Sequence, residues 1–307
     1  MQDEIHFNVD NGMGVITLNR PAALNALNIE MLNALHQQLL LWEKNKAILS
    51  ILIQSSTPGI FCAGGDIKAV YQAHQNKVPD IAQYFKKEYE LNQYIFHYAK
   101  PYIAFLDGLT MGGGAGVSLH GKLRIATEKF SFAMPETSIG YFPDVGTSYI
   151  LSRLPNEIGI YLALTSMRIN ATEANDIGLI DIDTSNGAQE NHLKKIATQI
   201  ATHFKYNTVE EIFESLVHDK QEWAQQTLAT LKQKSPTSLK LTLKLLRQTK
   251  SLDFDQCIAL EYKLASYFCE SHDFYEGIRA AVIDKDRNPR WNPNSLDKVD
   301  PAILDLI

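Results

Sequence analysis

Residues 101–146 read PYIAFLDGLTMGGGAGVSLHGKLRIATEKFSFAMPETSIGYFPDVG and contain most of the unusual residues of the chain. An apolar strand over 102–106 precedes a glycine cluster at 112–116, and two strand-like segments follow at 123–126 and 130–133. Consecutive glycines cost conformational entropy and offer no side chains for packing, so they persist where the backbone must approach another group closely. We therefore predict that the fold is organised around this stretch.

Two carboxylates, Glu136 and Asp144, lie in the Pro- and Gly-rich end of the same stretch. An acidic residue in an apolar stretch either reaches the surface or is buried with a partner or a shifted pKa. Taken alone, Glu136 after Pro135 could cap a helix, and Asp144 after Pro143 could be a turn residue. Both residues are also candidates for acid–base chemistry.

Composition indicates a globular protein with a full core, because the chain has 307 residues of which 45% are apolar. The 29 basic and 35 acidic residues give a net charge of −6, which argues against nucleic acid and against an anionic membrane surface as partners. Three scattered cysteines, Cys62, Cys257 and Cys269, fit neither a disulfide framework nor a metal site. No signal sequence or run of eighteen apolar residues occurs. We therefore expect a cytoplasmic protein in a reducing compartment.

The first half of the chain repeats the order strand, strand, helix. Alternating apolar residues around Asn11-Gly12 predict a β-hairpin over 4–19, and apolar residues at helical spacing predict a helix from Asn28. A buried strand is expected over 47–54, followed by a glycine-containing loop over 59–66 and a helix after it. The glycines after Met111 are expected to open a helix that runs to His120.

The second half of the chain is predicted to be helical. Thr208 and Glu211 form a capping-box pair, and Ser235-Pro236 is typical of a helix start. A final long helix is expected over 254–269. The change in composition near residue 190 predicts two parts, a core over 1–190 that holds the active site and a helical region over 191–307.

Two glycine loops, residues 63–66 and 111–114, each follow a predicted strand and precede a helix. Backbone N–H groups from two such loops can form an oxyanion hole, although tight packing of helix on strand would explain the glycines equally well. Val117 stands where a GxGxxG motif needs its last glycine. The sequence also contains no GxSxG, HExxH or P-loop motif.

Several longer motifs resemble a known family. The segments FCAGGDIK (61–68), MGGGAG (111–116) and MPET (134–137) resemble the enoyl-CoA hydratase/isomerase, or crotonase, superfamily. Within that superfamily, three segments are similar to the 3-hydroxyisobutyryl-CoA hydrolase branch, which are thioesterases of valine catabolism: residues 128–146, 235–243 and 272–291. The resemblance covers nearly the whole chain and departs from the family at about 183–207, which is shorter here.

The resemblance implies an α/β fold, a crotonase-type spiral of ββα units with a helical C-terminal region. It implies that the N–H groups of Gly65 and Gly113 hold the thioester oxygen of an acyl-CoA. Further contacts with the substrate would come from the following residues: Ala26, Ala63, Asp66, Ile67 and Lys68. Coenzyme A is then part of the substrate, and the resemblance implies neither a metal nor another cofactor.

By the same resemblance, Glu136 and Asp144 are the catalytic carboxylates and Glu88 contacts the substrate. Glu88 could instead belong to a solvated helix face or pair with a neighbouring lysine. Hydratases of this family carry a second glutamate where this chain has Gly116, and glycine cannot transfer a proton. This difference favours hydrolysis of a short branched 3-hydroxyacyl-CoA, with Glu136 acting as a base for water or as a nucleophile that forms a mixed anhydride.

Two other functions stay open at this point. One is a hydratase or isomerase of the same fold, and the other is a protein that binds acyl-CoA without turning it over. Cys62 lies beside the first glycine loop but has no basic residue in its motif, so we interpret it as a small buried apolar residue. Assembly into homo-oligomers is compatible with the resemblance.

Overall fold

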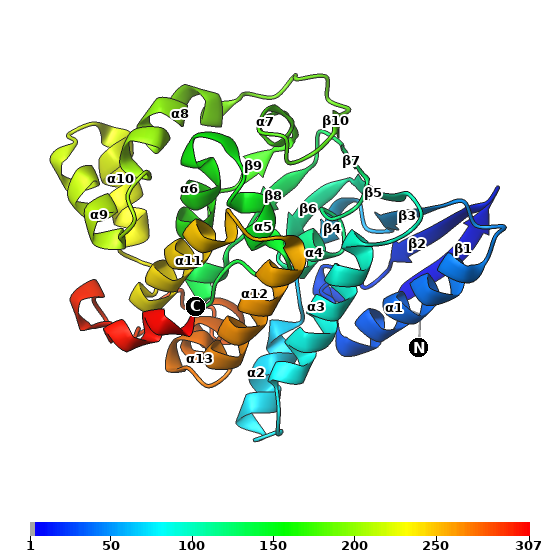
Figure 1. The fold of residues 1–307 in the computed structure, drawn as a ribbon, viewed down its shortest axis with the longest axis horizontal. Helices are drawn as coiled ribbons and strands as arrows, with labels where there is room; N and C mark the ends of the chain where they lie inside the picture. Colours follow the sequence, from blue (N-terminus) through cyan, green and yellow to red (C-terminus); the bar gives the residue numbers. More distant parts are fainter. Residues whose placement is uncertain (1–3) are drawn as a thin grey trace. The chain divides into compact units, whose positions relative to one another are not determined.

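The computed structural model describes residues 4–307, which form two compact units built from several segments each (Figure 1). The first unit comprises the residues up to 66 together with 83–133 and 168–192. The second comprises 67–82, 134–167 and 193–307. The strands of the described chain all lie in the first unit, and the second is helical. The predicted boundary at residue 190 stays a prediction, and the two units are each discontinuous in sequence.

A six-stranded sheet forms the larger layer of the first unit. Its strands, in spatial order, are β1 (Ile5–Asp10), β2 (Met13–Leu18), β3 (Ser50–Ser55), β5 (Tyr102–Leu106), β7 (Leu123–Ala126) and β10 (Ile182–Asp183). β1 and β2 are antiparallel and the other neighbours are parallel. The turn between β1 and β2 has positive φ at Asn11 (47°) and Gly12 (82°), so the predicted hairpin is confirmed.

A four-stranded sheet forms the smaller layer of the first unit. Its strands, in spatial order, are β4 (Gly59–Cys62), β6 (Gly108–Met111), β8 (Ser131–Ala133) and β9 (Ile169–Asn170). The first three are parallel, and β9 is antiparallel to β8. β4 corrects the loop predicted over 59–66. A left-handed glycine (Gly59, φ 75°) and an irregular register with β6 interrupt its pattern, so the strand depends on pairing with β6.

The helices of the first unit are α1 (Ile29–Lys44), α3 (Ala82–Phe96, apart from its first residue), α4 (Gly113–Gly116) and α7 (Ala171–Asp176). The side chain of Asn28 accepts a hydrogen bond from Met31 N (2.8 Å), which confirms the predicted start of α1. The helix predicted to run to His120 ends at Gly116 instead. Glycine is a poor helix former, and the Ser118 hydroxyl bonds to Gly114 O (2.6 Å) at the helix end.

The second unit is a group of helices. Its members are α2 (Ile67–Gln75), α5 (Thr147–Leu151), α6 (Ile158–Thr165), α8 (His192–His203, apart from its first residue), α9 (Val209–His218), α10 (Glu222–Leu231), α11 (Pro236–Thr249), α12 (Phe254–Phe268) and α13 (His272–Ile278), with the short 3-10 helix η2 (Glu136–Ile139). The capping box of Thr208 and Glu211 and the Ser235 cap before Pro236 are confirmed. Of the helices described, none is long and apolar enough to cross a bilayer.

Candidate active site

The first glycine loop is fastened to the segment before α1. Ala63 N donates to Leu24 O (3.0 Å), Leu27 N donates to Gly64 O (2.8 Å), and Asp66 N donates to Leu27 O (2.9 Å). Leu27 and Gly65 thus form a short parallel bridge. In this pattern the amide of Gly65 is left out of the ladder, although its neighbours on both sides are held in place.

Gly113, the first residue of α4, lies beside Gly65. A Cβ atom on Gly113 would be 3.1 Å from the amide nitrogen of Gly65 and would overlap Oε1 of Glu88. Within residues 4–307, neither the Gly65 nor the Gly113 amide N–H donates a hydrogen bond. Two neighbouring N–H groups, one of them at the start of a helix, provide what an oxyanion requires.

One face of α3 carries polar side chains toward these glycines. The Tyr84 hydroxyl donates to Leu27 O (2.7 Å) and accepts from Asp66 N (3.2 Å), so it braces the first loop. Glu88 follows one turn later, is 2% exposed, and its Oε1 lies against Gly113. Burial, together with the nearby charge of Glu88, raises the pKa of Tyr84 and keeps the phenol protonated. Asn92, another turn along, is fully buried.

Cys62 lies directly before the first loop and is inert. Its thiol is buried and contacts Asn25 O (3.0 Å) and Gly64 O (3.5 Å). Burial raises the pKa of Cys62 to about 12, which leaves it protonated near neutral pH. The structure therefore agrees with the interpretation of this residue as a small buried apolar group.

Arg20 links segments that were predicted to contact coenzyme A. Its guanidinium bonds to the carboxylate of Asp66 (2.8 Å) and to the carbonyl of Ala26 (2.8 Å), and it also pairs with Glu4 (3.0 Å). Ala26, Ala63 and Asp66 therefore lie on adjoining segments of the first unit. The other two predicted contact residues, Ile67 and Lys68, begin α2 in the second unit, where Lys68 is exposed.

Glu136 is the first residue of η2 in the second unit and is 6% exposed. The short helix is packed tightly against α13. A Cβ atom on Gly140 (φ 70°) would overlap the backbone of Asp273, and a Cβ atom on Gly277 would overlap the backbone of Ile139. These close approaches of backbone to backbone fix the position of η2, and with it the main chain of Glu136.

Asp144 lies in a loop that leads into α5 and is 5% exposed. The loop is held by Glu261 of α12, a fully buried residue whose carboxyl accepts from Gly146 N (2.7 Å), Ser148 N (3.2 Å) and Ser148 Oγ (2.5 Å). Burial raises the pKa of Glu261 to about 8, and the charge of Asp144 adds to the effect.

Two aromatic residues, Tyr141 and Phe142, lie between the two acidic groups. Tyr141 packs on Phe142 and Phe274 with ring centroids 4.6 Å apart in each pair, and Phe142 packs on Phe268 at 5.6 Å. This cluster attaches the middle of the segment to α12 and α13. Glu136 and Asp144 thus lie at the two ends of a segment whose centre is rigidly packed.

Comparison with known proteins identifies the family. A family model described as enoyl-CoA hydratase/isomerase matches residues 13–186 and 181–307. The chain belongs to this family. It is 41% identical to the mitochondrial 3-hydroxyisobutyryl-CoA hydrolase of Xenopus laevis, over 95% of this chain and 85% of the relative. With the human protein of the same name it shares 38% identity, over 93% and 83%.

Solved structures of the family have the same fold. A carnitinyl-CoA dehydratase from Mycobacterium thermoresistibile superimposes with a TM-score of 0.93 at 30% identity, covering 99% of this chain and 96% of that one. An enoyl-CoA hydratase from Rhodobacter sphaeroides 2.4.1 gives a TM-score of 0.93 at 32% identity with the same coverage. The predicted α/β crotonase fold with its helical C-terminal region is therefore confirmed.

The structure of this family member brings three predicted site residues together in the first unit, namely Gly65, Gly113 and Glu88. Glu136 and Asp144 lie in the second unit. The roles assigned to all five residues stay predictions. Among residues 4–307, no group of three or more His, Cys, Asp or Glu side chains is arranged to hold a metal ion.

Sequence reasoning missed the residues that support the site, above all Tyr84 and Glu261. Tyr84 precedes Glu88 by four residues, and this spacing of polar groups along a helix was the available signal. Glu261 had no such signal, because its partners in the loop after Asp144 are 113 or more residues away along the chain. Long-range partners of this kind are invisible to periodicity and motif spacing.

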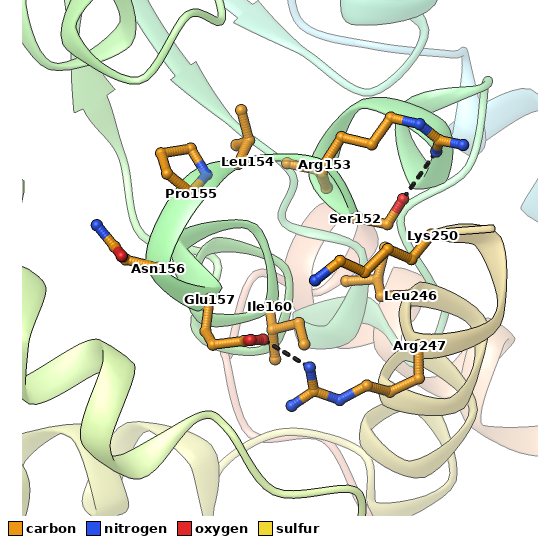
Figure 2. Close-up of a pocket in the computed structure, with 11 residues that line it drawn as sticks. Ser152, Arg153, Leu154, Pro155, Asn156, Glu157, Ile160, Leu246, Arg247 and Lys250 are labelled. Carbon is orange, nitrogen blue, oxygen red and sulfur yellow. Dashed lines mark hydrogen bonds and ion pairs between the residues drawn. The ribbon is translucent and has the colours of Figure 1, made fainter.

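A separate pocket of about 220 Å³ lies in the second unit between the end of α5 and the end of α11 (Figure 2). It contains none of the predicted site residues. Its two arginines are engaged in structural contacts: Arg247 pairs with Glu157 (2.6 Å), and Arg153 lies over the Tyr149 ring (3.8 Å) and bonds to Thr249 O (3.0 Å). We assign these contacts to the stability of the second unit.

Proposed function

We propose that the protein hydrolyses the thioester of a short branched 3-hydroxyacyl-CoA, with 3-hydroxyisobutyryl-CoA as the first candidate. Identity of about 40% with 3-hydroxyisobutyryl-CoA hydrolases over most of the chain supports this substrate. The observation that carries the choice of reaction is Gly116, which stands where hydratases of the family, by the resemblance described above, have a second acid–base glutamate. With one partner missing, concerted addition of water to a double bond loses its proton relay.

In this proposal the thioester carbonyl oxygen accepts hydrogen bonds from the N–H groups of Gly65 and Gly113. Attack on the carbonyl carbon moves negative charge onto that oxygen, and fixed N–H donors stabilise the charge more in the transition state than in the substrate. Neither amide has another acceptor among the described residues, so no bond would need to be broken to receive the oxygen.

Glu136 supplies the second component. As a general base it takes a proton from water while the water oxygen bonds to the carbonyl carbon. The tetrahedral intermediate then collapses, the carbon–sulfur bond breaks, and the leaving thiolate of coenzyme A takes up the proton. In the alternative route the Glu136 carboxylate itself attacks, which gives a mixed anhydride that water hydrolyses in a second step.

Asp144 and Glu88 are assigned to substrate recognition. A carboxylate accepts hydrogen bonds strongly from a hydroxyl group, so Asp144 is suited to the 3-hydroxyl of the acyl chain or to the ordering of water. Glu88 lies against Gly113 in the first unit, and its position supports a role close to the thioester oxygen. These roles separate a 3-hydroxyacyl substrate from an unsubstituted acyl chain.

The test is release of coenzyme A from 3-hydroxyisobutyryl-CoA, followed with a thiol reagent. Glu136→Gln should reduce kcat by at least about 100-fold, the scale expected for loss of a general base. Glu128→Gln is the matched control, because this exposed glutamate precedes Glu136 by eight residues in the same stretch. It should leave kcat unchanged.

Other outcomes point to other functions. Consumption of crotonyl-CoA without release of coenzyme A would indicate a hydratase, and the two solved structures with TM-scores of 0.93 carry such names. Binding of acyl-CoA esters with no turnover of any chain would indicate a non-catalytic protein. Undiminished turnover by Glu136→Gln would overturn the assignment of the base.

A labelling experiment tests the mixed-anhydride route for Glu136. During turnover in water enriched in oxygen-18, water that attacks the glutamate carbonyl of the anhydride leaves the label in the Glu136 carboxylate, and the acyl group departs with an unlabelled glutamate oxygen. Mass spectrometry of the peptide that contains residues 134–141 would detect it. A labelled peptide therefore establishes the anhydride route, whereas general-base catalysis, like attack of water on the acyl carbonyl of the anhydride, puts the label only in the released acid.

A further inference from the structure

The second unit contains a buried lysine that the proposed reaction does not use. Lys234 lies directly before Ser235, the N-cap residue of α11, and is 9% exposed. Its Nζ donates to the hydroxyl oxygens of Ser138 (2.6 Å) and Ser166 (3.3 Å). It forms no ion pair with a carboxylate in the part of the chain that the structure describes, residues 4–307.

This arrangement is unfavourable for the stability of the fold. A buried ammonium without a counter-ion has lost its hydration, and burial lowers the pKa of Lys234 to about 8. Its position also places a positive charge at the N-terminal end of α11, a helix of 14 residues whose dipole opposes that charge. An apolar side chain of similar length would fill the same space without these costs.

The lysine begins a chain of hydroxyl groups with a defined direction. Ser138 Oγ and Ser166 Oγ are 3.0 Å apart, Ser166 Oγ and Thr137 Oγ1 are 3.1 Å apart, and Thr137 Oγ1 donates to Ala163 O (3.3 Å). An ammonium can only donate and a carbonyl can only accept. With Lys234 as donor at one end and the Ala163 carbonyl as acceptor at the other, Ser138 donates to Ser166, which also accepts from Lys234, and Ser166 donates to Thr137.

Two of these hydroxyl groups belong to residues of η2. Thr137 and Ser138 are the residues immediately after Glu136, and the backbone carbonyl of Thr137 also accepts from Ser235 N (3.4 Å). The segment Lys234–Ser235 thus holds η2 through side chain and main chain at once. Ser235 is fixed in turn, because its hydroxyl donates to the carboxylate of Asp273 (2.6 Å).

We propose that Lys234 is a positioning residue for Glu136: its ammonium orients the Ser138, Ser166 and Thr137 hydroxyls and so holds η2 with the carboxylate of Glu136 in its working geometry. The proposal rests on the proposed function, in which Glu136 is the catalytic base or nucleophile. This role would offset the energetic cost of burying the Lys234 ammonium, because a catalytic group such as Glu136 requires a fixed position.

The test replaces Lys234 by methionine, which is unbranched, similar in length and uncharged. Lys234→Met should lower kcat roughly tenfold and leave KM within about twofold, because Glu136 acts on the bound substrate rather than in its binding. The midpoint of urea unfolding should stay the same or rise, because a buried unpaired charge is removed. If Lys234 had only a structural role, its substitution would lower both the stability and the activity.

Three comparisons make the result specific. Lys232→Met changes an exposed lysine two residues earlier and should leave kcat unchanged. Ser138→Ala removes the acceptor of the shorter bond and should lower kcat to a similar extent. The double variant Lys234→Met/Ser138→Ala should be no worse than either single variant, because both act along one path.

Hydrogen exchange gives a readout that is independent of activity. The amide of Tyr141 donates to Glu136 O (3.0 Å), and it should exchange at least about tenfold faster in Lys234→Met than in Lys232→Met. Unchanged exchange, an unchanged kcat, or additive losses of kcat in the double variant would overturn the proposal. If wild type releases no coenzyme A, the proposed function fails instead, and the exchange measurement still reports whether Lys234 holds η2.

Discussion

The two acidic loops of the second unit are each held by a buried side chain, one of which donates hydrogen bonds and the other of which accepts them. η2, which begins with Glu136, is held by the ammonium of Lys234 through hydroxyl oxygens. The loop after Asp144 is held by the carboxyl of Glu261 through two N–H groups and a hydroxyl. The hydrogen-bonding role of each buried side chain, or anchor, complements its loop. Lys234 donates to the hydroxyl acceptors of η2, and Glu261 accepts from N–H groups at the start of α5 that would otherwise have no partner.

The two anchors differ in their effect on the stability of the fold. Glu261 acts much as an N-cap residue does, since its carboxyl accepts hydrogen bonds from N–H donors at a helix start that would otherwise be buried without a partner. Lys234 donates to hydroxyl oxygens, but its positive charge lies at the N-terminal end of α11, where the helix dipole disfavours a cation. We therefore expect the loss of Glu261 to destabilise the protein and the loss of Lys234 to affect the site without destabilising the fold.

The largest effect on stability is expected for Glu261→Ala. This substitution leaves the donors of Gly146 and Ser148 buried without an acceptor, and we expect a loss of about 3 kcal/mol or more in the free energy of unfolding. Urea unfolding measures it. Glu214→Ala, at an exposed position of α9, is the control and should change stability by less than about 0.5 kcal/mol. Equal effects of the two variants would show that Glu261 is not an anchor.

A smaller effect is expected for Gly140→Ala at the end of η2. Gly140 has a φ of 70°, and an added Cβ would also overlap the backbone of Asp273, so we expect a loss of about 2 kcal/mol. Gly178→Ala separates the two causes. Gly178 has a φ of 76° with nothing within 4 Å of the added atom, so only the backbone strain of about 1 kcal/mol should appear. If both variants lose the same amount, the packing of α13 on η2 does not hold the loop.

The two anchors should also give pH dependences of opposite sign. Glu261 has a folded pKa of about 8 against an ordinary 4.5, so between these values the folded chain keeps a proton that the unfolded chain has lost. The free energy of unfolding then falls as pH rises from about 4.5 to about 8. Lys234 has a folded pKa of about 8 against 10.5, so the unfolded chain keeps the extra proton. Its contribution rises as pH increases from about 8 to about 10.5.

Urea unfolding across this pH range, with the variants Glu261→Gln and Lys234→Met, measures the two slopes separately. Glu261→Gln should remove at least about 1 kcal/mol of the decrease in the free energy of unfolding between about pH 4.5 and about pH 8. Lys234→Met should remove its increase between about pH 8 and about pH 10.5. Wild-type slopes in both variants would show that neither group titrates differently in the folded and unfolded chains.

Much of the local structure could be predicted from the sequence. The Asn11-Gly12 hairpin, the caps at Asn28, Thr208 and Ser235, and the order of strand, strand and helix are all confirmed. These features depend on residues a few positions apart, such as a turn dipeptide or a capping pair. The predictions that were wrong, the loop in place of β4 and the long helix after Gly113, concerned glycine-rich segments, where local preference is weak and strand pairing decides.

The family, the fold class and the residues that are candidates for chemistry could be predicted from the sequence, because glycine loops and acidic motifs are local patterns. Only the tertiary structure decided that Gly65 and Gly113 are neighbours with available amides, and that Glu88 lies against them. It also decided which buried groups hold the acidic loops. Lys234 is 96 residues from Ser138, and Glu261 is 113 from Ser148, so their burial and pKa values exist only once the chain has folded.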